Sequence, residues 1–187
     1  PHNIEIPDYV IERIIAKRGK LEVFDRFEAS KTAFLVIDMQ NFYVAEVDTA
    51  ISIVPNINRI ATACREKGVP VIWVIMTVAD EVGAPSQWRL YHEYFFTDAK
   101  GKNHLTQLSE GHKGHELYPD LDVKDGEQIV HKKRFSPFII GSSDLHDRLQ
   151  EKGIENLIVA GTATNMCSES AARDAMMLDY KVVMVED

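Results

Sequence analysis

The sequence predicts one α/β domain, in which a parallel sheet carries helices on both faces. Five short runs read as strands, and the first two have the nearly continuous apolar character of strands buried on both sides. Helical patterns alternate with these runs, which favours parallel strands joined by right-handed crossovers. The 187 residues, 45% of them hydrophobic, are enough for a substantial core. The expected strands are 32–38, 70–78, 127–131, 156–160 and 181–186.

Composition excludes several classes of partner. The net charge of −8 argues against nucleic acid and anionic membranes, because neither attracts an acidic protein. The most basic run, 17–20, reads as a solvated helix end. Two cysteines are too few for a disulfide scaffold, and no apolar stretch has the length of a signal peptide or a membrane span. We therefore expect a cytoplasmic, reducing setting; a short leader could have preceded Pro1.

Two helical patterns flank the first strand. The pattern over 4–20 ends at Gly19, and its apolar positions favour packing or an oligomer contact. The second pattern stops at Gly68 and places Cys64 on an apolar stripe, so Cys64 is interpreted as a core residue. The apolar positions of the two patterns are Val10, Ile11, Ile14 and Ile15, and Ile57, Ile60, Ala61 and Cys64.

The first strand ends on a carboxylate, Asp38. Ligand sites of open α/β sheets lie beyond the carboxyl ends of the strands, so Asp38 points towards the place where chemistry would occur. An aspartate in this position also commonly caps a helix or forms a turn, and that alternative stays open here.

The segment after the second strand is irregular and rich in aromatic residues. Such long connections are commonly binding loops or lids, so these side chains predict either a wall of a substrate pocket or a subunit interface. The loop is expected to continue over 101–126, and its three histidines are interpreted as solvent-exposed because no recognised metal-binding motif accompanies them. The aromatic residues are Trp88, Tyr91, Tyr94, Phe95 and Phe96, and the histidines are His104, His112 and His115.

The third strand is followed directly by Lys132, Lys133 and Arg134. Beyond this basic run, Ser142 or Ser143 is expected to cap a helix that stops at Gly153. Leu145 and Leu149 mark the inner face of that helix. A lysine of the 132/133 pair therefore lies at the same expected edge of the sheet as Asp38.

The stretch 157–175 is the most informative in the chain. An apolar run meets Gly161, turns, and sets Cys167 at the start of a helical pattern. The N–H groups and the positive end of the dipole at a helix start favour a thiolate over a thiol, and they can hold an oxyanion. Cys167 is thus a candidate nucleophile, although a free cysteine is often only a small buried hydrophobe.

Three strand ends together predict a chemistry. Asp38 can take the thiol proton of Cys167 and later return it to a leaving amine. A lysine between them would stabilise the carboxylate and the forming thiolate. Attack on an amide-type carbonyl, loss of amine or ammonia and hydrolysis of the thioester by water would complete a covalent hydrolysis.

Three motifs give this sequence a specific resemblance. The segments IDMQN at 37–41, KKRFSPF at 132–138 and AGTATNMCSESAARDA at 160–175 resemble the isochorismatase-like cysteine hydrolases, in register from about residue 31 onward. Within that family the motif sequences are most similar to those of ureidoacrylate amidohydrolases and related amidases of carbamoyl compounds. The resemblance implies a Rossmann-like parallel sheet of five to six strands and a catalytic triad of Asp38, Lys132 and Cys167. Lys132 is chosen over Lys133 because the family pattern is lysine, any residue, arginine, aromatic, serine.

The resemblance also implies a cis peptide bond just before Ala163, with the N–H groups of Ala163 and Cys167 as the oxyanion hole. Nicotinamidases of the family carry an Asp-x-His metal site, but 42–60 contains no histidine. We therefore expect no metal, no cofactor and no action on nicotinamide. Retention of Cys167 favours C–N hydrolysis over the vinyl-ether cleavage of isochorismatases proper.

The resemblance sets the expected domain organisation as well. Residues 1–187 are expected to form a single hydrolase domain, with 1–30 as an N-terminal extension. Relatives usually continue beyond the position of Asp187 through a helix and often a strand, so either that tail is missing here or a partner subunit covers the face. Family members are commonly dimers or tetramers, and we expect a homo-oligomer.

The leading hypothesis is an amidohydrolase of a small amide, ureido or carbamoyl compound. Six residues are candidates for contacts with this substrate, and for each a structural role is an equal alternative. A non-catalytic or binding member with a preserved site is the rival hypothesis, and a redox-active thiol is a third. The candidates are Gln40, Asn41 and Arg134 for polar contacts, and Trp88, Tyr91 and Phe95 for the pocket wall.

Overall fold

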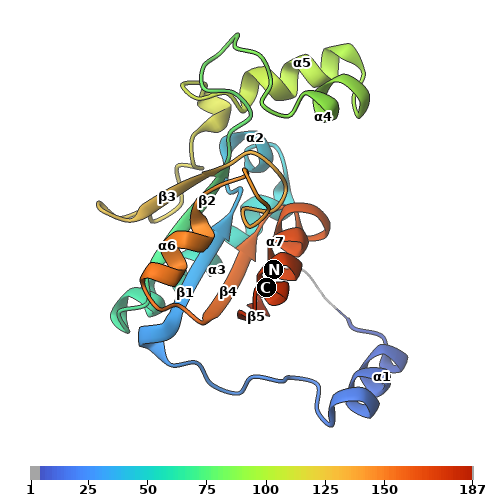
Figure 1. Cartoon of the computed structure of the whole chain (residues 1–187), viewed down its shortest axis with the longest axis vertical. Coiled ribbons are helices and arrows are strands. Elements are labelled where there is room, and N and C mark those ends of the chain that lie inside the picture. The colour runs from blue at the N-terminus through green and yellow to red at the C-terminus, as the bar shows by residue number, and fades with distance from the viewer. Residues whose placement is uncertain (1–4, 187) are drawn as a thin grey trace.

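A computed structural model describes residues 5–186, and a five-stranded parallel sheet forms its centre (Figure 1). The strand order is β3-β2-β1-β4-β5, and every neighbouring pair is parallel. Each expected strand overlaps one observed strand, with β3 and β4 each running one residue past the expected end, so the predicted fold class is confirmed. The strands are β1 (Thr32–Ile37), β2 (Val71–Met76), β3 (Gln128–Lys132), β4 (Asn156–Gly161) and β5 (Lys181–Met184).

Helices cover both faces of the sheet. Alternate side chains of β1 and β2 divide between two cores, because successive residues of a strand point to opposite faces. On one face α3 (Asp48–Glu66) packs Ala50, Val54 and Ile57 against the strands. Cys64 belongs to the same core, as expected. On the other face lie α6 (Leu145–Glu151) and α7 (Glu169–Met177).

The strand order reverses beside β1, and this position determines where a site can form. From β1 the chain moves outward to β2 and β3, then returns to the other side of β1 as β4. The last residue of β1, Ile37, pairs with Val74 on one side and with Gly161 on the other. A crevice at such a switch point is the usual ligand site of an open α/β sheet.

Between β2 and β3 the chain forms two helices above the carboxyl edge of the sheet (Figure 1). These are α4 (Arg89–Tyr94) and α5 (Asp98–Gln107), followed by the short η2 (Lys113–His115). The expectation of a continuous loop over 101–126 is therefore wrong for its first part. The histidines there also differ from expectation, because His104 and His115 are buried among neighbouring side chains. No described helix has both the length and the apolar content to cross a membrane.

The N-terminal helix α1 (Asp8–Arg18) lies apart from the sheet (Figure 1). It ends where Gly19 adopts a left-handed conformation, as the sequence predicted, and it has no buried side chain. The predicted pattern began at Ile4, which lies outside the described residues. Three short turns complete the chain: η1 (Ala29–Lys31), α2 (Asn41–Val44) and a π-helical turn η3 (Thr164–Ser168).

Candidate active site

Asp38, Lys132 and Cys167 meet at the carboxyl edge of the sheet. Asp38 directly follows β1, Lys132 is the last residue of β3, and Cys167 lies in the turn η3 after β4. The Nζ atom of Lys132 is 2.8 Å from Oδ2 of Asp38 and 3.3 Å from Sγ of Cys167. All three side chains are buried. The structure thus places an acid, a cation and a thiol in mutual contact, shielded from water.

Local backbone geometry places Asp38 and Lys132. Asp38 has a φ of 50°, a left-handed conformation that aspartate tolerates better than most residues. Its N–H donates to the carbonyl of Val74, which adds one more hydrogen bond to β2 after the end of β1. The chain then turns away from β2. Lys132 is in register with Met76, and its carbonyl accepts from the N–H of Thr77. The strand register therefore directs Lys132 to Asp38, whereas Lys133 lies beyond the strand.

The turn before Cys167 requires a glycine at its start. Gly161 has a φ of 119°, and a Cβ atom there would lie 2.1 Å from the carbonyl oxygen of Ile37. The peptide bond between Thr162 and Ala163 is cis, as the resemblance implied. The Thr162 hydroxyl donates to the carbonyl oxygen of Asp38 at 2.8 Å, which joins this turn to the end of β1. Cys167 lies within η3, two residues before α7 begins, near the helix start that the sequence predicted.

The electrostatics of the thiol differ from expectation. Burial raises the pKa of Cys167 well above its usual range, and the charge of Asp38 raises it further, while Lys132 opposes both. Burial and the charge of Asp38 thus oppose the thiolate that the helix start is expected to favour. Burial also raises the pKa of Asp38, against the charge of Lys132 and contacts with Cys167, Lys132 and the Met76 backbone. Both shifts favour the protonated form, so the Asp38 carboxylate is a stronger base than an ordinary one.

Gln40 and Asn41 contact backbone instead of an open pocket. The Gln40 side chain is 0% exposed, and its amide nitrogen donates to the carbonyls of Met76 and His115 at 3.0 and 2.8 Å. Its amide oxygen accepts from the N–H of Met76 at 2.8 Å. Asn41 donates to the carbonyl of Lys113 at 2.9 Å. The interpretation of Gln40 as a substrate contact is therefore corrected, because its polar atoms are already satisfied.

The aromatic candidates divide into two groups. Trp88 and Tyr91 stack with ring centroids 4.3 Å apart, and Phe135 meets both rings edge-on. Trp88 packs against the core that includes Cys167, and burial, with a smaller contribution from Cys167, raises the pKa of Tyr91. Phe95 instead lies 70% exposed at the end of α4. The structure thus brings Trp88 and Tyr91 to the site and leaves Phe95 outside it.

Arg134 lies at the rim of this aromatic wall. The centre of its guanidinium is 5.1 Å from the centroid of Trp88, and one nitrogen donates to the carbonyls of Gln87 and Lys133. Its own carbonyl accepts from Nζ of Lys132 at 3.2 Å. Arg134 is therefore close to the site through both its backbone and its side chain.

Two further residues of the site were missed in the sequence. Burial, with the charges of Asp38 and Cys167, raises the pKa of Tyr43 well above its usual value. Burial, with His92 and Lys132, lowers the pKa of His104 to about 4. Tyr43 follows Asp38 by five positions, a nearness that could have indicated it. His104 carried no such signal, because only the packing of α5 over the sheet edge brings it here.

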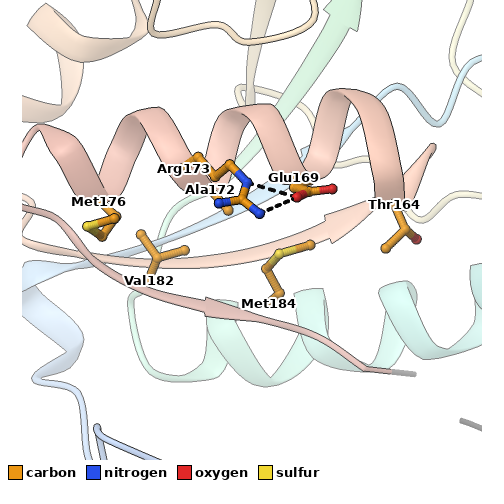
Figure 2. Close-up of a pocket in the computed structure, with 7 residues that line it drawn as sticks. All are labelled: Thr164, Glu169, Ala172, Arg173, Met176, Val182 and Met184. Carbon is orange, nitrogen blue, oxygen red and sulfur yellow. Dashed lines mark hydrogen bonds and ion pairs between the residues drawn. The ribbon is translucent and has the colours of Figure 1, made fainter. Parts of the chain in front are cut away.

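A separate groove of about 420 Å³ lies between α7 and β5 (Figure 2). Apolar side chains line most of it, and Glu169 and Arg173 pair with each other along one turn of α7. None of its lining residues is Asp38, Lys132 or Cys167, so this groove is not the candidate active site. It is lined by Thr164, Glu169, Ala172, Arg173, Met176, Val182 and Met184.

Comparisons with known proteins identify the family of the chain. The family model described as the Isochorismatase domain matches residues 32–187. A probable inactive nicotinamidase of Arabidopsis thaliana is 36% identical over 161 residues, covering 82% of this chain and 77% of that protein. The ureidoacrylate amidohydrolase RutB of Pseudomonas savastanoi pv. phaseolicola is 29% identical over 201 residues, covering 98% and 79%. A cysteine hydrolase crystal structure from Pseudomonas syringae pv. phaseolicola has a TM-score of 0.76 at 26% identity, covering 90% and 76%.

Proposed function

Because the chain belongs to the isochorismatase family of hydrolases, we propose that it is a cysteine-dependent amidohydrolase of a small amide, ureido or carbamoyl compound. The observation that carries the proposal is the contact of Lys132 with both Asp38 and Cys167 inside a buried site. The similarity to ureidoacrylate amidohydrolases supports the ureido or carbamoyl class of substrate. Two free cysteines support the cytoplasmic setting expected from the sequence.

In the proposed acylation step, Asp38 accepts the thiol proton of Cys167 as sulfur attacks the substrate carbonyl carbon. The C–S bond forms, and the carbonyl electron pair moves to oxygen. The N–H groups of Ala163 and Cys167 would hold that oxyanion. Lys132 stabilises the anionic thiolate while the proton resides on Asp38. Asp38 then returns the proton to the leaving nitrogen, the C–N bond breaks, and a thioester remains on Cys167.

In the proposed deacylation step, water replaces the departed amine. Asp38 takes a proton from this water as its oxygen attacks the thioester carbonyl carbon. The tetrahedral intermediate collapses, the C–S bond breaks, and the thiolate recovers the proton from Asp38. The raised pKa of Asp38 suits a group that must alternately accept and return a proton near neutral pH.

Arg134 and the aromatic pair are proposed to set substrate preference. The stacked rings of Trp88 and Tyr91 offer an apolar wall, and the guanidinium at its edge offers charge-assisted hydrogen bonds. A carboxylate on the substrate, such as the one in ureidoacrylate, would suit that guanidinium. Arg134→Met should therefore raise KM for an acidic ureido substrate more than for a neutral amide of similar size.

A non-catalytic role is the second candidate. The observation that favours it is the 36% identity to a relative named as a probable inactive nicotinamidase. In that case the buried site would bind a small molecule without releasing ammonia. The two candidates differ in turnover, so one experiment separates them.

The test measures ammonia release by the purified protein from a panel of ureido acids, carbamoyl amino acids and simple amides, with nicotinamide included. We expect turnover of at least one ureido or carbamoyl compound, and a loss of about a thousandfold or more in Cys167→Ala. Cys64→Ala is the matched control, because Cys64 is an equally buried cysteine in the core on the α3 face. Undiminished turnover in Cys167→Ala would contradict the covalent mechanism. Binding without ammonia release from any compound would favour the non-catalytic role.

A further inference from the structure

The β1–β2 pairing stops before β2 does. The last pair of this ladder is Ile37 with Val74, and the N–H of Asp38 makes one more bond to the carbonyl of Val74. There the positive φ of Asp38 turns the chain away. β2 continues to Met76, so its final residue has no backbone of β1 beside it. Both polar groups of Met76 on this side need another partner.

The side-chain amide of Gln40 supplies that partner. Its oxygen accepts from the N–H of Met76 at 2.8 Å, and its nitrogen donates to the carbonyl of Met76 at 3.0 Å. An amide side chain has the same donor and acceptor as a peptide group, so Gln40 continues the ladder in place of backbone. The second N–H of the Gln40 amide donates to the carbonyl of His115 at 2.8 Å, so Gln40 also holds the loop after α5.

Met76 in turn fixes the lysine. Met76 pairs in register with Lys132, and the N–H of Thr77 donates to the carbonyl of Lys132 at 2.9 Å. The end of β1 is therefore linked to the end of β3 through the Gln40 amide bonded to Met76 and the N–H of the next residue, Thr77, bonded to Lys132. The two ends of this link carry Asp38 and Lys132, whose charged atoms are 2.8 Å apart.

We propose that Gln40 is a positioning residue, whose buried amide joins the ends of β1 and β2 and so sets the distance between Asp38 and Lys132. This inference rests on the proposed pairing of Asp38 with Cys167 and deepens it. Gln40 acts through the backbone and does not touch the reacting atoms. Its loss would let the Asp38–Lys132 contact lengthen, which weakens the stabilisation of the Asp38 carboxylate by the lysine charge.

The test measures the protonation of the Asp38–Cys167 pair through the reactivity of Cys167, and it needs no substrate. Iodoacetamide alkylates Cys167 only after the first of the two protons held by Asp38 and Cys167 has left the pair. The alkylation rate should therefore fall as the pH drops below the apparent pKa of the pair, and this fall is the acidic limb of the profile. The rate is followed against pH by mass spectrometry of the Cys167 peptide in the full chain. Peptide analysis separates it from Cys64, whose buried thiol is an internal reference.

The variant is Gln40→Met, which keeps the length of the side chain and removes its amide. We expect the acidic limb of Cys167 alkylation to move upward by about one pH unit, a tenfold change in the protonation equilibrium. Gln40→Asn places its amide one methylene short and should produce the same shift, so it carries the test if Gln40→Met does not fold. Asn156→Leu is the matched control. Asn156 is a buried amide bonded to Lys31 and Thr32 at the opposite end of the sheet.

The outcomes separate positioning from simple stabilisation. A shift in the Gln40 variants, with none in Asn156→Leu despite comparable loss of thermal stability, supports the proposal. An unchanged limb in a folded Gln40 variant, or an equal shift in the control, overturns it. Failure of the proposed function looks different: the wild type would release no ammonia from any compound, whatever the alkylation profile of the variants.

Discussion

Lys132 is a lysine whose side chain is completely buried, and its charge is balanced by Asp38. Removing one partner of a buried pair leaves the other charge uncompensated, so Lys132→Met should lower the free energy of unfolding near pH 7 by about 3 kcal/mol. Asp38 can take up a proton once its partner is gone, so the loss should be smaller near pH 5. Urea unfolding at the two pH values measures this difference. An equal loss at both would contradict the assignment of the cost to the Asp38 charge.

Gly161 offers a second residue-scale prediction. A Cβ atom there would overlap the backbone of β1, and the φ of 119° is unfavourable for any side chain. Gly161→Ala should therefore destabilise the protein by about 3 kcal/mol or more. Gly153→Ala is the control, because Gly153 also has a positive φ but faces open space, so it should cost only about 1 kcal/mol. Denaturant midpoints compare the two, and equal costs would refute the steric explanation.

The pH dependence of turnover follows from Asp38. The base must be ionised to accept the thiol proton, so kcat/KM should rise with pH as Asp38 loses its own proton. Because burial raises the pKa of Asp38, this acidic limb should lie above the ordinary carboxyl range of about 4. The same shift means that ionising Asp38 costs stability as pH rises through that limb, since the folded state holds the proton more strongly. A limb at or below the ordinary carboxyl pKa would contradict this role for Asp38.

At this scale the sequence predicted the three central side chains and failed on their surroundings. Asp38 and Cys167 follow strands and Lys132 is the last residue of one, and parallel strands bring such positions to one edge. The environment of Gln40 was not predictable, because the partners of its amide come from β2 and the loop after α5. The raised pKa of Cys167 was not predictable for a related reason: position at a helix start is visible in the sequence, but burial beside a carboxylate is not.

At the scale of elements, a histidine pair joins α4 to α5. Nε2 of His92 lies 2.9 Å from Nδ1 of His104, and one of these nitrogens must lack a proton for the hydrogen bond to form. Since the pKa of His104 falls to about 4 in the folded state, stability should be lost as pH falls from about 6.5 towards 4, by about 3 kcal/mol. Unfolding free energies across this range test the prediction.

His104→Asn is the informative variant for this pair. An asparagine amide can replace Nδ1 as the partner of His92 but does not titrate. The variant should therefore lose most of the decline between about pH 6.5 and 4, apart from the part contributed by His92, whose pKa burial also lowers. A decline as steep as that of the wild type would show that other groups cause it.

The helices α4 and α5 explain why one region resisted prediction. Their sequences lack a clear apolar stripe, and α5 contains Gly101 in its first turn. A Cβ atom at Gly101 would lie 2.8 Å from the carbonyl oxygen of His92, so this glycine allows the two helices to approach closely. Tertiary packing thus overrides weak local propensity here. The strands and α3, in contrast, carry strong apolar patterns and were predicted.

At the scale of the whole molecule, α1 carries apolar side chains among its charged ones, and none of them is buried against the rest of the chain that the structure describes. Tyr9 is 71% exposed and Ile15 is 45% exposed, and an isolated helix of this length is marginal in water. We expect α1 to rest on a second copy in a homo-oligomer. Trypsin cleavage after Lys17, Arg18 or Lys20 should then slow as protein concentration rises, in parallel with the size measured by chromatography. A single small species with concentration-independent cleavage would contradict this expectation.

The position of β4 beside β1 has a consequence for biosynthesis. Asp38 and Lys132 belong to strands that can pair once β1, β2 and β3 have been made. Cys167 arrives only with β4, whose first residue, Asn156, contacts Thr32 across 124 positions of sequence. Contacts so distant in sequence form slowly. A chain emerging from the ribosome therefore carries the base and the lysine before the nucleophile, and the site cannot become active until β4 and the turn after it have been released.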